Sequence, residues 1–141
     1  MILRNGYFET YCEVCDSKYT DKYNKWCKPC QISSLNQITS KNTSKNGKID
    51  NLIKEMQLKI KTSQDIVFQW ISYDQFSNIE IINENDFIKT CSAIWKDGPL
   101  NYDKNENKYI RNQSLKVNLI CFFNSQNAID KILNEVIWFS I

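Results

Sequence analysis

Several features are absent from this 141-residue sequence, and each absence narrows what the protein can be. There is no histidine, so a metal site built around the cysteines can use only thiolate ligands. No uninterrupted apolar run approaches the ~20 residues needed to cross a bilayer, so we expect no membrane-spanning helix. The opening residues 1–4 are too short and wrongly ordered for a secretion signal. We therefore expect an intracellular protein in a reducing compartment, the cytoplasm, with the nucleus also open.

What the sequence does contain is two cysteine pairs with metal-ligand spacing. Cys12 and Cys15 form one CxxC pair, Cys27 and Cys30 form the other, and eleven residues separate the pairs. Two residues between thiolates let a tight turn aim both sulfurs at one ion, and two such turns complete a tetrahedral site. We predict a structural zinc bound by all four, with no open position for catalysis. Two disulfides or four unrelated thiols are the alternatives, and disulfides fit a reducing compartment less well.

Charge is unevenly distributed along the chain. The formal net charge is +2, yet residues 1–62 hold eleven Lys or Arg against six Asp or Glu, and the remainder holds seven against ten. Four cysteinates around one zinc add two negative charges, so the basic excess does not establish nucleic-acid binding. In that alternative Tyr19, Tyr23 and Trp26 would stack on bases beside lysines. We favour Trp26 as the hydrophobic anchor of a small module instead.

The composition changes after residue 32. Residues 33–48 are mostly Ser, Asn, Thr and Lys, which predicts a mobile linker. Residues 49–63 predict an amphipathic helix that packs on a core. The apolar residues at helical spacing are Ile49, Leu52, Ile53, Met56 and Ile60.

The remaining residues, 64–141, favour a sheet. Short apolar, β-branched and aromatic runs predict strands at 66–71, 79–82, 87–95 and 115–123. The polar stretch 96–113 predicts a long exposed hairpin loop, with antiparallel strands on either side. Apolar residues at helical spacing from 128 to 136 predict a final helix. The expected fold class is α+β: a zinc-ribbon-like four-cysteine module (1–32), a linker (33–48), a helix (49–63), and a short antiparallel sheet with one helix (64–141).

Three tracts carry a resemblance to a known family: residues 70–82 (WISYDQFSNIEII), residues 93–98 (AIWKDG) and Asn134-Glu135. They resemble the beginning of a protein kinase domain. The chain is most similar to an expanded group of fungal kinase-like proteins in which a cysteine module and a linking helix precede the kinase domain. The resemblance covers nearly the whole sequence. It implies that residues 64–141 form a truncated kinase amino-terminal lobe.

The same resemblance implies that the nucleotide site is degenerate. The three glycines of the family's phosphate-binding loop fall on Asn83, Asn85 and Ile88, so side chains occupy the space for phosphates. The phosphate-binding lysine falls on Ile120, and neither Lys89 nor Lys116 is placed to replace it. Neither ATP nor magnesium is therefore expected as a cofactor. The degenerate positions by resemblance are Ile82, Asn83, Asn85, Ile88, Thr90, Asn118, Ile120 and Glu135.

The resemblance implies a pseudokinase fragment without phosphotransferase activity. The sequence ends at Ile141, before the family's HRD and DFG motifs, so the alternative is a kinase whose activity depends on downstream sequence. Strand 115–123 would be a sheet edge with no wholly polar face, which favours pairing with a protein partner or a second copy. A scaffold role and a zinc-ribbon nucleic-acid-binding role remain alternatives.

Overall fold

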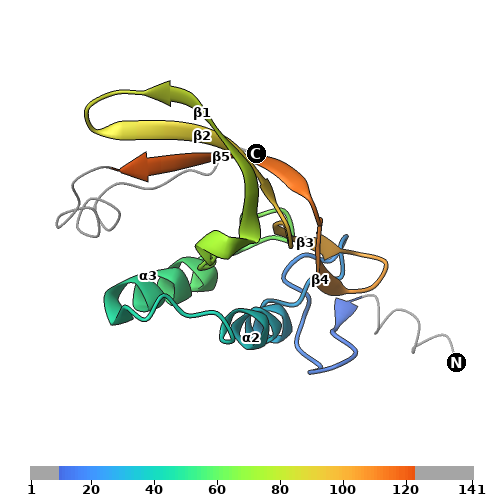
Figure 1. Cartoon of the computed structure of the whole chain (residues 1–141). Coiled ribbons are helices and arrows are strands. Elements are labelled where there is room, and N and C mark those ends of the chain that lie inside the picture. Colours follow the sequence, from blue (N-terminus) through green and yellow to red (C-terminus); the bar gives the residue numbers. More distant parts are fainter. Residues whose placement is uncertain (1–9, 123–141) are drawn as a thin grey trace, which may run out of the picture.

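The computed structural model describes residues 10–122 of the chain. The described part is α+β, with two helices and two antiparallel sheets (Figure 1). No helix within it is long and apolar enough to span a bilayer. The predicted helix at 128–136, with Glu135, lies outside the described residues. The elements are α2 (Lys28–Thr39), α3 (Gly47–Leu58), the 3-10 turn η1 (Tyr73–Gln75), β1 (Phe76–Glu84), β2 (Ile88–Trp95), β3 (Leu100–Asp103), β4 (Lys108–Arg111) and β5 (Leu115–Phe122).

Helix α2 begins at the second cysteine pair and runs into the segment expected to be a linker. Cys27 is its N-cap residue, and Pro29 stands in the first turn, where a missing N–H costs nothing. The mobile linker predicted for 33–48 is therefore wrong for residues 33–39. Leu35 is fully buried and Ile38 packs against the same core. Two apolar residues three apart share one helix face, so they bury one side of an otherwise polar helix.

Helix α3 corresponds to the predicted amphipathic helix, although it ends at Leu58 rather than at residue 63. Asn46 caps it by accepting hydrogen bonds from the backbone N–H groups of Lys48 and Ile49. Near its end the buried Gln57 side chain donates to the Phe68 carbonyl at 2.7 Å. That bond fixes the segment around Phe68 against the helix.

The strand predicted at 66–71 is wrong, because these residues belong to no helix and no sheet. Side chains hold the segment instead. Gln69 accepts a hydrogen bond from Arg111 of β4 at 2.9 Å, and Val67 is buried. This segment is therefore held by side-chain and core contacts rather than by the backbone hydrogen bonds of a sheet.

Strands β1, β2 and β5 form a three-stranded antiparallel sheet in the order β1-β2-β5. The β2–β5 register runs without a break from Ile88↔Phe122 to Trp95↔Leu115. This confirms the antiparallel pairing expected for the strands that flank 96–113. Alternate residues of β2 and β5 are buried on one face, which we call the sheet core. Its buried members are Cys91, Ala93, Trp95, Val117 and Leu119.

The polar stretch 96–113 is not a loop but carries a second hairpin, β3 paired with β4. Gly98 adopts φ +71°, and a Cβ there would lie 1.7 Å from the backbone oxygen of Asn112. Only glycine fits this close approach at the base of the hairpin. The hairpin lies beside α2 (Figure 1), and it buries Leu100 and Tyr109. The expectation of an exposed loop was wrong because these two residues are widely spaced among polar ones.

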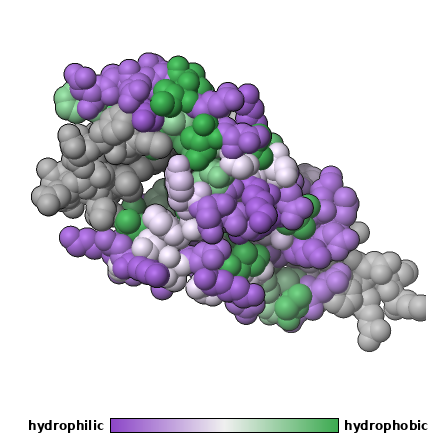
Figure 2. Space-filling view, viewed as in Figure 1, coloured by the Kyte–Doolittle hydropathy of each residue, from purple (hydrophilic) through white to green (hydrophobic). Residues whose placement is uncertain are grey.

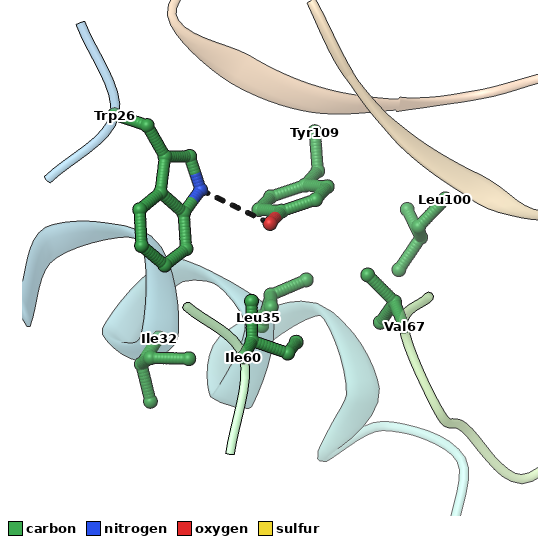
Figure 3. Packing of buried hydrophobic residues seen from close by; sticks show 7 residues of the cluster. All are labelled: Trp26, Ile32, Leu35, Ile60, Val67, Leu100 and Tyr109. Atoms are coloured by element: carbon green, nitrogen blue, oxygen red, sulfur yellow. Dashed lines mark hydrogen bonds between the residues drawn. The ribbon is translucent and has the colours of Figure 1, made fainter. Parts of the chain in front are cut away.

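A second hydrophobic cluster, the metal-side core, joins segments from both halves of the chain (Figure 3). The residues come from the cysteine-rich segment, α2, the residues that follow α3, the segment 66–71 and the β3–β4 hairpin. Residues expected in separate modules therefore share one core. Its buried members are Trp26, Ile32, Leu35, Ile60, Val67, Leu100 and Tyr109.

Candidate metal centre

The first cysteine pair lies on a tight turn of a short hairpin. Tyr11 and Lys18 face each other across it in an isolated antiparallel bridge. The Cys12 N–H donates to the Ser17 carbonyl at 2.8 Å, and the Asp16 N–H donates to the Cys12 carbonyl at 2.9 Å. Asp16 adopts φ +62°, a conformation that Asp tolerates better than most residues. This is the kind of turn that the CxxC spacing predicts.

The second pair is positioned differently from the sequence expectation, because it stands at the start of a helix. A bridge between Asp21 and Trp26 delivers the chain to Cys27, the N-cap of α2, and Cys30 lies in the first helical turn. Residues three apart on a helix lie on the same face, so both thiols can point to one ion. The partial positive charge at a helix N-terminus also favours thiolates there.

The four sulfur atoms come together in one cluster. The ligand atoms of Cys12, Cys15, Cys27 and Cys30 all lie within 4.8 Å of one another. The Sγ atoms of Cys12 and Cys30 are 3.8 Å apart, and those of Cys15 and Cys27 are 3.4 Å apart. Four sulfurs bound tetrahedrally to one zinc-sized ion would be about 3.8 Å apart, whereas bonded sulfurs would be about 2.05 Å apart. These cysteines are therefore free thiols close enough to hold a metal ion.

The thiols differ in their surroundings. Cys12 and Cys27 are buried, whereas Cys15 is exposed. Hydrogen bonds from the Ser17 side chain and backbone lower the pKa of Cys15 to about 6. Burial raises the pKa of Cys27 to about 11 and also raises the pKa of Cys30. Without a cation, the Cys15 thiolate is favoured while Cys27 and Cys30 keep their protons, so a bound divalent ion would displace protons from this cluster.

The centre is fixed to the rest of the molecule through Trp26, which directly precedes Cys27. Trp26 has 0% exposure, and its indole N–H donates to the Tyr109 hydroxyl at 3.1 Å (Figure 3). The hydrophobic-anchor role predicted for Trp26 is thus confirmed, and a buried indole cannot stack on a base. Tyr23, by contrast, faces solvent at 96% exposure.

Two further hydrogen bonds join the cysteine-rich segment to the β3–β4 hairpin. The Tyr102 hydroxyl donates to the Lys25 carbonyl at 3.2 Å, and the Gln31 side chain donates to the Asn107 carbonyl at 3.2 Å. Sequence reasoning missed these supports because they come from a polar stretch. The signal available within that stretch was its two tyrosines and its glycine, Tyr102, Tyr109 and Gly98.

The predicted nucleotide-site positions lie on the three-stranded sheet, away from the cysteines in sequence. Thr90 stands directly opposite Ile120, and Asn118 stands opposite Ser92, so all four residues share one face. On β1, Asn83 is paired with Thr90. Ile82 is exposed. Ile120 therefore lies on the same face of the sheet as Thr90. An isoleucine, rather than a lysine, occupies this position.

The turn between β1 and β2 is closed by a side chain. The Asn85 side-chain oxygen accepts hydrogen bonds from the N–H groups of Phe87 and Ile88, at 2.9 and 2.8 Å. The Asn85 N–H in turn donates to the Ile88 carbonyl at 2.9 Å. Neither Asn83 nor Asn85 uses the positive φ that asparagine could supply. The N–H groups of Asn85, Phe87 and Ile88 are therefore already occupied within the turn.

Lys89, considered as a replacement for the missing lysine, is placed on the other face. It stands opposite Glu84 and next in sequence to Thr90, so its side chain leaves the sheet on the side away from Thr90. Its ammonium lies 3.5 Å from the Glu84 carboxylate. Lys89 therefore lies on the opposite face of the sheet from Thr90, Asn118 and Ile120, as strand alternation predicts.

Comparisons of the chain with protein-family models, with curated proteins and with solved structures gave no match. The chemistry of the cluster must therefore be inferred from its own ligands. Four thiolates form a soft donor set, which suits zinc and other thiophilic ions rather than Mg²⁺ or Ca²⁺. One tight turn and one helix N-terminus position these ligands, and the metal-side core supports them.

Proposed function

We propose that the four-cysteine cluster is a structural zinc site, and the grouping of all four sulfurs within 4.8 Å is the observation that carries this proposal. Zinc accepts four thiolates in a tetrahedral shell, and the sulfur–sulfur separations of 3.8 and 3.4 Å fit that geometry. With all four positions filled by protein, the ion has no bound water to activate. Its role is to hold the first hairpin against the start of α2.

Beyond the metal, we propose that the chain is a non-catalytic, kinase-like module that acts in protein interaction or signalling. Three observations support it. The β1-β2-β5 meander puts the degenerate positions Thr90, Asn118 and Ile120 on one face. Asn85 occupies the N–H groups of Phe87 and Ile88, in the turn that the resemblance aligns with the family's phosphate-binding loop. No cation stands at Ile120 to neutralise a triphosphate.

The interaction part of the proposal is supported by the surface of the sheet. Within residues 10–122, β5 has a ladder partner on one side only, and unpaired edges invite pairing with another chain. Figure 2 shows hydrophobic side chains near the top of the molecule, where Figure 1 places β1. The exposed apolar residues of this region are Ile79, Ile81, Ile82 and Phe87.

The metal assignment is tested by counting ions. Protein purified without chelator should contain one zinc per chain by elemental analysis. Replacing zinc with Co²⁺ should give the intense visible bands of a tetrahedral tetrathiolate. Cys27→Ser should lose both the zinc and these bands, whereas Cys91→Ser, which changes a thiol of the sheet core, should keep them. Metal-free wild-type protein with native secondary structure would refute the proposed site.

The absence of nucleotide binding is tested by calorimetry and by thermal unfolding with ATP and Mg²⁺. We expect no saturable heat and no rise in Tm across millimolar nucleotide. An Asn85→Gly variant, which frees the N–H groups of the β1–β2 turn, is the matched comparison and should still fail to bind because Ile120 remains. Saturable binding by the wild-type protein would contradict the non-catalytic proposal.

A further inference from the structure

The four thiols of the cluster are not equally accessible. Cys12 and Cys27 are 6% and 1% exposed, and Cys30 is half-buried. Cys15 is exposed and sits on the turn of the first hairpin, beside Val14, which is 86% exposed. A dissolved reagent therefore meets Cys15 before the other ligands. The Sγ atoms of Cys15 and Cys27 lie 3.4 Å apart.

We propose that Cys15 is a redox modification site: hydrogen peroxide oxidises it, Cys27 captures the oxidised sulfur as a disulfide, and the zinc is released. The inference rests on the proposed zinc site and assigns to it a mode of regulation. Exposure selects Cys15 as the first thiolate to react, because access and thiolate character govern oxidation. Proximity selects Cys27 as its partner. The remaining pair, Cys12 and Cys30, keeps its thiols.

The chemistry balances with peroxide as the oxidant. The Cys15 thiolate attacks one peroxide oxygen, the O–O bond breaks, and sulfenic acid and hydroxide form. The Cys27 thiolate then attacks the Cys15 sulfur, forms the S–S bond and expels a second hydroxide. The two sulfurs have lost two electrons, and both peroxide oxygens have been reduced to the level of water after protonation. Zinc keeps only two protein thiolates and dissociates. A dithiol reductant reverses the step.

The structural consequence extends beyond the metal. Cys27 is the N-cap of α2 and follows Trp26 directly. The Trp26 indole donates to Tyr109 of β4, so the position of Cys27 affects contacts with the β3–β4 hairpin. Loss of the ion removes the link between the first hairpin and α2. Oxidation at an exposed thiol thereby loosens the metal-side core.

The test uses the full chain loaded with zinc, with zinc content measured first. Peroxide is added, and released zinc is followed with a chromogenic chelator while free thiols are alkylated and mapped by mass spectrometry. We expect zinc release to parallel the appearance of a Cys15–Cys27 disulfide, with Cys12 and Cys30 still alkylated. A sulfenic-acid trap should label Cys15 first. A first disulfide at any other pair, or first labelling at Cys12 or Cys27, would overturn the inference while leaving the zinc site intact.

Two variants provide a matched pair, because histidine can replace one thiolate as a zinc ligand. Cys15→His removes the exposed thiol, and its zinc release by peroxide should slow by roughly tenfold or more. Cys30→His keeps Cys15 and should release zinc about as fast as wild type. Equal slowing in both variants would count against Cys15 as the reactive site. Should either variant fail to fold, the wild-type peptide map still decides the question. Absence of zinc before peroxide is added would refute the proposed function itself.

Discussion

The two hydrophobic cores of this chain are built in opposite ways. The metal-side core collects residues from Trp26 to Tyr109, which stand 83 positions apart and meet through one hydrogen bond. The buried residues of the sheet core come from β2 and β5, which share an unbroken antiparallel register. One core therefore depends on a few long-range contacts, and the other depends on a continuous backbone ladder.

This difference suggests why the cysteine cluster lies where it does. A small core drawn from distant segments must offset a large chain entropy, and a metal cross-link lowers that cost. The sheet core contains no cluster of metal-ligating side chains within the described residues. Strand β1 of the same sheet instead leaves apolar side chains exposed to solvent. We expect the two cores to respond differently to each of the following changes.

Removing the metal should have the largest effect, and it should fall on the metal-side core. Structural zinc contributes apparent binding free energy on the order of 10 kcal/mol in small domains. Treatment with a strong chelator should therefore abolish the protection of backbone amides around Trp26 and Tyr109 against hydrogen exchange. The amides that join β2 to β5 should stay protected.

Leu119→Ala is the corresponding test of the sheet core. It removes a buried side chain from the sheet core, at a cost of roughly 3 kcal/mol. Exchange should accelerate in β2 and β5, while the protein should still bind one zinc. Simultaneous loss of protection in both cores, in either experiment, would show that they unfold as one unit.

Gly98→Ala should have the next largest effect, because Gly98 lies where the two cores are connected. The new Cβ would meet the Asn112 backbone oxygen at 1.7 Å, in a backbone conformation with φ +71°. Relief requires the base of the β3–β4 hairpin to move, which we expect to cost roughly 3 kcal/mol. Denaturant unfolding measures the loss.

Gly47→Ala is the control for that substitution. A Cβ at Gly47 meets nothing within 4 Å, and Gly47 opens α3. This variant should be neutral or more stable by up to about 1 kcal/mol. Equal destabilisation by both substitutions would contradict the steric account of Gly98.

The elements that sequence reasoning found have strong local signals. The four cysteines form a cluster because CxxC spacing constrains each pair locally. Residues 49–63 predicted a helix from apolar periodicity, and α3 occupies most of that range. The strands at 87–95 and 115–123 were visible as β-branched and aromatic runs, and they pair as expected.

The elements that were missed depend on contacts distant in sequence. Residues 33–39 look polar, yet Leu35 and Ile38 give this part of α2 a place in the metal-side core. The β3–β4 hairpin contributes Leu100 and Tyr109 to partners far away in the chain. Likewise, CxxC spacing is equally compatible with a tight turn and with a helix start, so it did not distinguish the two cysteine pairs. Tertiary packing decided each case, and local pattern carries little information about it.

Tyr109→Phe should have a moderate effect confined to the metal-side core. The substitution deletes the acceptor of the Trp26 indole N–H and leaves that donor buried. An unsatisfied buried donor costs about 1–2 kcal/mol. Tyr102→Phe is the matched control, because its hydroxyl donates to Lys25 at an exposed position and its loss should cost less. A larger loss for Tyr102→Phe, measured by urea unfolding, would contradict the assigned role of Trp26.

Acidification should have the smallest effect of this series, through Asp65, which lies between the core residues Ile60 and Val67. The N–H of Lys61 donates to its carboxylate at 2.7 Å, and the Thr62 hydroxyl donates at 2.9 Å; these bonds lower the pKa of Asp65 against the opposing effect of burial. Because the folded pKa is below the unfolded value of about 3.9, this stabilisation is full above that value and is lost as pH falls through the folded pKa. Asp65→Asn should therefore be less stable than wild type at neutral pH, by under about 1 kcal/mol, and the difference should shrink at pH values well below 3.9.

Acid also displaces zinc from thiolates in both proteins, so the stability difference between the variant and the wild type, and not the wild-type curve alone, reports on Asp65. A difference that stays constant with pH would show that the carboxylate contributes through shape rather than charge.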